Sequence, residues 1–416
     1  MSNKPKLEGI LKAHISLSGV AERTPTSFNL NFSDRYESKV YFKREDLQVV
    51  RSYKLRGAYN KVSSLSDKEK EHGIVCASAG NHAQGVAYSC KKLGIKGTVF
   101  MPSVTPKQKI NQVRMFGKDM VDIVLTGDTF DDAYTEARAF EDKHGATFVH
   151  PFDDTKIIEG QGTVALEIVT DIDQQIDYLF VPIGGGGLAS GLITAFKQLS
   201  PDTKIIGLEP EGAPAMKRSI EEGKNVTLDE IDTFVDGAAV RAVGKLPLEI
   251  CKDGLDEIKL VPEGKICTTI LQLYNQEAIV VEPAGALSLA ALDFYKDEIK
   301  GKTVVCIVSG SNNDITRTEE IKERSLLYEG VKHYFMVRFP QRVGALKEFV
   351  SDVLGPEDDI VHFEYSKKHN RENGPVFIGV ELHDKESLNT LFENMTKNNF
   401  PYEYLNEKPD LLQYLI

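Results

Sequence analysis

From residue 40 to about residue 310, short apolar segments alternate with longer segments of helical periodicity. The short segments have the length and composition of strands, and the longer ones predict helices. Such an alternation predicts a parallel sheet wrapped by helices. The predicted strands are residues 40–43, 73–77, 97–101, 121–125, 147–149, 178–182, 204–208 and 303–308, and the predicted helices include 55–65, 81–93, 106–116 and 128–144.

Near residue 326 the pattern changes to a small β-α-β-β-α-β unit of the ferredoxin-like kind. Its predicted strands are 333–339, 361–365, 376–382 and a short one near Tyr402, and its predicted helices are 344–353 and 386–395. The charged segment 323–331 reads as a linker. We therefore predict a first domain at 1–325, with a small lobe at about 50–150 and a large lobe formed by the remainder, and a second domain at 326–416.

Composition excludes several classes of partner. The chain has 416 residues and a net charge of -12, which argues against nucleic acid and anionic membranes as partners. No apolar run reaches membrane-spanning length, and the N-terminal residues lack the apolar core of a signal peptide. The five cysteines are scattered without metal-type spacing, so they predict buried free thiols in a reducing compartment, the cytoplasm. We expect no metal.

Four consecutive glycines, Gly184 to Gly187, follow the predicted strand 178–182 and open a helix. Glycines let a ligand approach the backbone closely, and the N–H groups of a helix N-terminus favour an anion, so the loop predicts a phosphate site. It is not a Walker loop, since no Gly-Lys-Ser/Thr follows. A flexible turn is the alternative, but four glycines between a strand and a helix are costly to order.

Three further stretches carry candidate chemistry. Lys54 precedes the helix 55–65, where the helix dipole would lower an amine's pKa, as a Schiff-base lysine requires; a solvated surface lysine is the alternative for this residue taken alone. The loop 78–82 follows strand 73–77 and suits a carboxylate, although helix capping by Ser78 or Asn81 explains it equally well. Ser309 ends strand 303–308, where an N-cap with a turn is the alternative.

Together these stretches resemble one enzyme class. Ser52-Tyr53-Lys54-Leu55-Arg56-Gly57, Ser78-Ala79-Gly80-Asn81-His82, the glycine run and Ser309-Gly310-Ser311-Asn312 resemble the fold-type II (tryptophan synthase β-like) pyridoxal phosphate enzymes, and among them the threonine dehydratase (threonine ammonia-lyase) group. The resemblance spans about residues 8 to 325. The tail, most recognisably at 339–346, resembles the single ACT-like regulatory domain of the short biosynthetic members.

The resemblance implies a role for each matching residue. Lys54 would form the Schiff base with pyridoxal 5'-phosphate and act as the catalytic base. Tyr53 replaces a more usual Phe but still offers a ring to flank the cofactor. The resemblance further assigns the cofactor phosphate to Gly184, Gly185, Gly186, Gly187 and Leu188, its 3'-oxygen to Asn81, its pyridine nitrogen to Ser309, and the substrate carboxylate to Ser78, Ala79, Gly80 and His82.

The implied activity is the deamination of L-threonine, and also of L-serine, by β-elimination of water, as the first step of isoleucine biosynthesis. The implied assembly is a homotetramer with isoleucine as effector. A catabolic dehydratase, a serine racemase/dehydratase and a non-catalytic amino-acid sensor are the alternatives. Ala79 stands where the racemases carry a second acid/base serine, and Glu209-Pro210 is followed by no acid beyond Glu211, which argues against their metal site. An intact Lys54 argues against the sensor.

Overall fold

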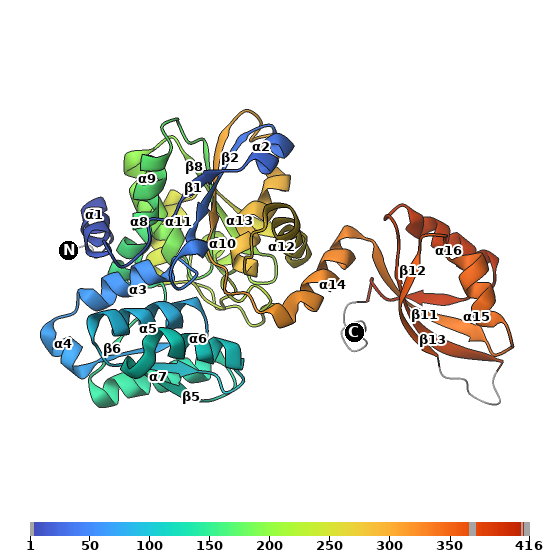
Figure 1. The fold of residues 1–416 in the computed structure, drawn as a ribbon, viewed down its shortest axis with the longest axis horizontal. Helices are drawn as coiled ribbons and strands as arrows, with labels where there is room; N and C mark the ends of the chain where they lie inside the picture. The colour runs from blue at the N-terminus through green and yellow to red at the C-terminus, as the bar shows by residue number, and fades with distance from the viewer. Residues whose placement is uncertain (1–3, 366–371, 409–410, 412–416) are drawn as a thin grey trace. The chain divides into compact units, whose positions relative to one another are not determined.

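The computed structural model describes residues 4–365, 372–408 and 411. The chain forms two compact units, Met1–Ile315 and Thr316–Ile416 (Figure 1). The segment predicted as a linker is helical, because α14 (Thr318–Glu329) runs through it. The predicted boundary between residues 325 and 326 therefore lies inside a helix of the second unit.

The larger sheet of the first unit has the strand order β1-β2-β10-β7-β8-β9. All neighbouring strands are parallel except β1 and β2. The central strands β7 and β10 are buried at every position, because helices cover both faces. The strands are β1 (Thr26–Phe28), β2 (Lys39–Arg44), β7 (Tyr178–Pro182), β8 (Lys204–Pro210), β9 (Glu257–Val261) and β10 (Thr303–Val308).

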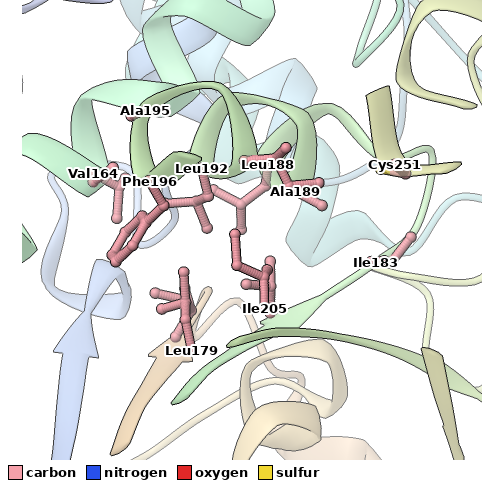
Figure 2. Packing of buried hydrophobic residues seen from close by; sticks show 14 of the residues in the cluster. Val164, Leu179, Ile183, Leu188, Ala189, Leu192, Ala195, Phe196, Ile205 and Cys251 are labelled. Atoms are coloured by element: carbon pink, nitrogen blue, oxygen red, sulfur yellow. The ribbon is translucent and has the colours of Figure 1, made fainter. Parts of the chain in front are cut away.

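One face of this sheet packs against α9 (Gly187–Leu199), the helix that the glycine run opens. Figure 2 shows Leu188, Leu192 and Phe196 of α9 above Leu179 and Ile205 of the sheet. This packing fixes the start of α9 at the carboxyl end of β7. The other helices of the large lobe are α1 (Leu7–Ser16), α2 (Leu30–Tyr36), α8 (Thr155–Asp171), α10 (Ala215–Glu222), α11 (Lys245–Gly254), α12 (Glu263–Glu277) and α13 (Pro283–Ala290).

The smaller sheet of the first unit is fully parallel, with the order β5-β4-β3-β6. Figure 1 shows α5, α6 and α7 gathered around it. Its strands are β3 (Ile74–Ala77), β4 (Gly97–Met101), β5 (Val121–Leu125) and β6 (Thr147–Phe148). The helices of this part are α3 (Lys54–Ser63), α4 (Asp67–His72), α5 (Asn81–Leu93), α6 (Lys107–Gly117) and α7 (Phe130–His144).

The second unit has the predicted β-α-β-β-α-β order after α14. Its antiparallel sheet has the order β12-β13-β11-β14, with an aromatic core that includes Phe335, Phe339 and Phe349. The elements are β11 (Lys332–Pro340), α15 (Ala345–Glu348), β12 (Asp359–Tyr365), β13 (Asn373–Glu381), α16 (Ser387–Lys397) and β14 (Tyr402–Tyr404).

The predicted fold class, two parallel-sheet lobes followed by a ferredoxin-like domain, is confirmed. All five cysteines are buried and none forms a disulfide within the described chain, as predicted. No helix in the described part of the chain is both long and apolar enough to cross a membrane.

Candidate active site

The four stretches singled out in the sequence meet at the carboxyl ends of strands from both sheets. The start of α3 lies beside the end of β10, because Ser52 pairs with Gly310 as an isolated antiparallel bridge. The Tyr53 N–H donates to the Ser309 carbonyl at 3.3 Å. Carboxyl ends of parallel strands are where open α/β sheets bind ligands. The geometry therefore places Lys54 and Ser309 in one site.

The loop after β3 joins the same site through its asparagine. Asn81 begins α5, its Oδ1 accepts a hydrogen bond from Asn312 Nδ2, and Asn312 also donates to the Val50 carbonyl at 3.2 Å. The Asn81 Nδ2 donates to Glu282 Oε1 at 2.7 Å. Asn81 is thus held between the end of β10 and the start of α13.

The glycine loop reaches the site through the segment that follows β6. Lys54 Nζ donates to the Pro151 carbonyl at 3.2 Å. The next residue, Phe152, packs so closely on the loop that a Cβ at Gly185 would lie 2.2 Å from its ring, and one at Gly187 would lie 3.0 Å from its Cα. Gly186 has φ +90°, a conformation that favours glycine. Glycine is therefore required at these positions by packing within the protein. Close approach to a ligand, which the sequence suggested, is not the sole reason for the glycine run.

The amine of Lys54 is tuned towards the neutral form. Burial by the surrounding protein lowers the pKa of Lys54 to about 8, although the nearby Glu282 carboxylate favours the ammonium and opposes the shift. The Lys54 Nζ also lies 5.5 Å from the centre of the Tyr53 ring. An amine with such a pKa is a usable nucleophile and base near neutral pH.

Some predicted site residues turn their side chains away from the site. Leu188 is buried under α9 in the core of the large lobe (Figure 2), and Ala79 packs against the core of the small lobe. The His82 Nε2 lies 2.8 Å from the Val149 carbonyl, and burial lowers the pKa of His82 to about 3, so the ring is neutral and donates there. Any contact of these three residues with a ligand would therefore have to come from their backbone N–H groups. The first N–H groups of α5 and α9 have no carbonyl of their own helix to bind.

Ser309 and Ser78 both lie at the end of a strand but bond differently. Ser309 is buried, and its hydroxyl donates to the Ala284 carbonyl at 3.1 Å. The Ser78 Oγ accepts from the Gly80 N–H at 3.2 Å, which forms a turn within the loop and does not cap α5. Capping by Asn81 is also excluded, since it bonds Glu282 and Asn312. A Cβ at Gly80 would meet no atom within 4 Å, so open space lies beside this loop.

Sequence reasoning missed Glu282. It immediately precedes α13 and is 4 % exposed, yet its carboxylate does not cap that helix. It accepts instead from Asn81 and from the Asn312 backbone N–H, and burial raises the pKa of Glu282 to about 7. The pattern Glu-Pro at a helix start reads as ordinary N-terminal chemistry, and only the packed structure shows that the side chain faces the site.

The residues present fit pyridoxal 5'-phosphate. The site combines an amine of lowered pKa, a glycine loop at a helix N-terminus, a buried hydroxyl at the end of β10 and a part-buried carboxamide at the start of α5. Phosphate, aldehyde and ring nitrogen would each find matching chemistry here.

Comparison with known proteins agrees with this chemistry. Residues 17–310 match the family described as pyridoxal-phosphate dependent enzyme, and residues 323–415 match the C-terminal regulatory domain of threonine dehydratase. The chain is 59 % identical over 413 residues to the "L-threonine dehydratase biosynthetic IlvA" of Halalkalibacterium halodurans, which covers 99 % of this chain and 100 % of the relative.

Solved structures are similar over the first unit. The processed form of threonine deaminase isoform 2 from Solanum lycopersicum has a TM-score of 0.72 at 39 % identity, covering 78 % of this chain and 96 % of that chain. The serine racemase from Dictyostelium discoideum has a TM-score of 0.69 at 32 % identity, covering 75 % of this chain and 99 % of that chain. The first unit thus shares its fold with enzymes of two activities.

Proposed function

This chain belongs to the threonine dehydratase family of pyridoxal-phosphate-dependent enzymes, and we propose that it converts L-threonine to 2-oxobutanoate and ammonia in isoleucine biosynthesis. The observation that carries this proposal is the Lys54 amine with its lowered pKa. Hydrogen bonds and packing join the start of α3, which carries this amine, to the glycine loop and to the ends of β3 and β10. Near-complete coverage of a biosynthetic relative at 59 % identity supports the substrate.

The cofactor would be held at four points. Lys54 would attach it covalently, the N–H groups of Gly184 to Leu188 would bind its phosphate, Asn81 its 3'-oxygen and Ser309 its ring nitrogen. When bound, pyridoxal 5'-phosphate supplies a conjugated ring that takes up the charge developing at the substrate Cα. Ser309 is uncharged, so it would not stabilise a protonated ring nitrogen as an aspartate would.

The chain's own residues would orient the substrate and transfer the protons. The N–H groups at the start of α5, with Ser78 and Gly80, would hold the substrate carboxylate. The Lys54 amine would take the Cα proton. The β-hydroxyl would leave as water after it receives a proton, which the resulting Lys54 ammonium can supply, and the released enamine would tautomerise and take up water, which gives 2-oxobutanoate and ammonia. L-Serine would yield pyruvate by the same steps.

The alternatives are less well supported. The high-identity relatives are named biosynthetic threonine dehydratases, which argues against a catabolic enzyme. A racemase needs a second acid/base group, and Ala79 stands at the position where racemases carry it. The carboxylate of Glu209 accepts from the backbone N–H groups of Met216 and Lys217 and so caps α10, which does not resemble an open metal site.

The second unit is proposed as a regulatory domain that binds isoleucine. The proposed division at residues 325 and 326 agrees in outline with family matches at 17–310 and 323–415. A cavity of about 450 Å³ lies beside the turn that precedes α15, lined by apolar side chains such as Leu346 and Val350 and by Arg342. Apolar walls and a guanidinium suit an aliphatic amino acid. A homotetramer in the cytoplasm completes the proposal, on family resemblance.

A direct assay tests the proposed activity. Purified enzyme with L-threonine should form 2-oxobutanoate, and L-serine should give pyruvate with essentially no D-serine by chiral chromatography. Lys54→Ala should lower turnover by at least about 10³-fold, because one amine serves as both nucleophile and base. Lys61→Ala on the same helix is the matched control. Steady-state 2-oxobutanoate from Lys54→Ala would remove Lys54 from this role, and D-serine formed as fast as pyruvate would favour the racemase.

A further inference from the structure

Glu282 is a buried carboxylate that the proposed chemistry does not use. It lies at the N-terminus of α13, but its side chain leaves the helix end and reaches Asn81 on α5 and the backbone N–H of Asn312. Burying a carboxylate without a cation costs free energy. A helix cap would explain a carboxylate at this position, but Glu282 makes no such hydrogen bond, so helix stability does not account for it.

The charged groups around Glu282 come from several elements. Lys54 on α3 faces it, and Asp236, in the loop after α10, and Lys109 on α6 act on it from a distance, as an ion pair with each other. No cation lies within ion-pair distance of the Glu282 carboxylate in the part of the chain that the structure describes. The buried carboxylate is therefore compensated by hydrogen bonds that it accepts, and Asn81 is the side chain that donates one of them.

The hydrogen bonds of Asn81 leave one donor hydrogen for a ligand. Its Oδ1 accepts from Asn312, and one Nδ2 hydrogen goes to Glu282. An amide nitrogen has two hydrogens, so one remains for the site. An ionised carboxylate can only accept, which forces Asn81 to present Nδ2 to it. A protonated carboxyl can donate to Oδ1 instead, and the orientation of the amide is then no longer fixed.

We propose that Glu282 is a positioning residue whose ionised carboxylate fixes the Asn81 carboxamide with one Nδ2 hydrogen directed at the cofactor. This inference rests on the proposed function, since it takes pyridoxal 5'-phosphate as the ligand of Asn81. It makes cofactor binding depend on the protonation of a residue that does not touch the cofactor. Because burial raises the pKa of Glu282 to about 7, the dependence falls in the neutral range.

The test measures the equilibrium dissociation constant of pyridoxal 5'-phosphate for the full chain at pH 6 and pH 8, by absorbance and fluorescence titration. Part of any pH step comes from the Lys54 amine itself, because its pKa of about 8 leaves it mostly charged at pH 6. The wild type should show a further weakening of roughly 2- to 10-fold at pH 6, the worth of one hydrogen bond. Glu282→Gln, which cannot ionise, should lose this further weakening and keep the part that comes from Lys54. Glu209→Gln is the matched control. Burial raises the pKa of Glu209 to about 7 as well, but its carboxylate bonds the start of α10 and makes no contact with Asn81. This variant should keep the full pH step of the wild type.

A second variant guards against misfolding of the first. Asn81→Ala should lose the same part of the pH step with Glu282 intact, and adding Glu282→Gln to it should change nothing further. A pH step as large as that of the wild type in Glu282→Gln or in Asn81→Ala, or independent effects of the two substitutions, would overturn the inference. Failure of the wild type to bind the cofactor would contradict the proposed function as well. Binding and turnover with no part of the pH step that depends on Glu282 would contradict the positioning role alone.

Discussion

At the scale of single residues, burial decides how the ionisable groups of the site behave. Lys54 and Glu282 influence each other, yet desolvation moves both towards their neutral forms, with pKa values of about 8 and about 7. The sequence predicted Lys54 because a lysine at a helix start is locally unusual. It did not reveal Glu282, because nothing in Val281-Glu282-Pro283 shows that the side chain is 4 % exposed.

Glu282 also has a consequence for stability. Its pKa is raised in the folded state, so the folded protein binds the proton more tightly, and stability falls as pH rises from about 4.5 to about 7. Above that range the buried charge costs about 3 kcal/mol. Glu282→Gln should therefore match the wild type at pH 5 and exceed it by up to this amount at pH 8.

Chemical unfolding of the apoprotein at the two pH values checks this prediction, because bound cofactor would add its own stabilisation. The exposed Glu230→Gln is the control and should show no pH-dependent difference. If Glu282→Gln lost stability equally at pH 5 and pH 8, the carboxylate would be contributing packing and hydrogen bonds without a desolvation cost.

At the scale of elements, a buried ionic cluster fixes the helix that begins with Lys54. Arg56 is 1 % exposed and makes two hydrogen bonds to Glu45 and two to Glu167, while Lys43 bonds Glu167 at 2.6 Å. The cluster joins β2, the turn after it, α3 and α8. Arg56 thus anchors the first turn of α3, two residues beyond the amine.

Removing Arg56 should leave two buried carboxylates facing one lysine. Arg56→Met should destabilise the protein by about 3–5 kcal/mol, the usual cost of breaking a buried pair. Lys61→Met is the control on the same helix, since its ion pair with Asp154 is partly exposed and worth at most about 1 kcal/mol. Urea unfolding of the two variants compares these losses, and an equal loss would show that the cluster does not hold the helix.

The strands and loops of the site were predictable, but α8 was not. The predicted strands 97–101, 178–182 and 303–308 match the observed ones, because their apolar runs are largely buried in a sheet. The predicted strand 121–125 also matches, although this edge strand has no buried residue. In α8, Gly160 and Gly162 weaken the helical signal. A Cβ at Gly160 would lie 2.5 Å from the Arg56 carbonyl oxygen, so a glycine is required here by the close packing of α8 against α3. The sequence does not reveal this packing.

At the scale of the whole molecule, the chemistry and the proposed regulation belong to separate units. Every stretch of the site lies within Met1–Ile315, and the cavity beside α15 lies within Thr316–Ile416. The alignment with a solved threonine deaminase chain from Solanum lycopersicum covers 96 % of that chain but only 78 % of this one. A catalytic unit of this kind is therefore expected to fold without the second one. The sequence predicted both units, but the charged segment between them concealed α14.

This separation makes the isoleucine proposal testable. Inhibition requires isoleucine to bind the less active state more tightly, with a coupling of roughly 1–3 kcal/mol, or about 5- to 150-fold in apparent affinity. At threonine below half-saturation, isoleucine should inhibit the full chain and leave a fragment ending at Ile315 active and insensitive. Leu346→Asp, which places a charge in the apolar cavity at a 43 % exposed position, should shift the inhibition curve of the full chain to higher isoleucine. A flat isoleucine titration of the full chain would mean that the second unit does not sense isoleucine, and its remaining role would be to stabilise an assembly.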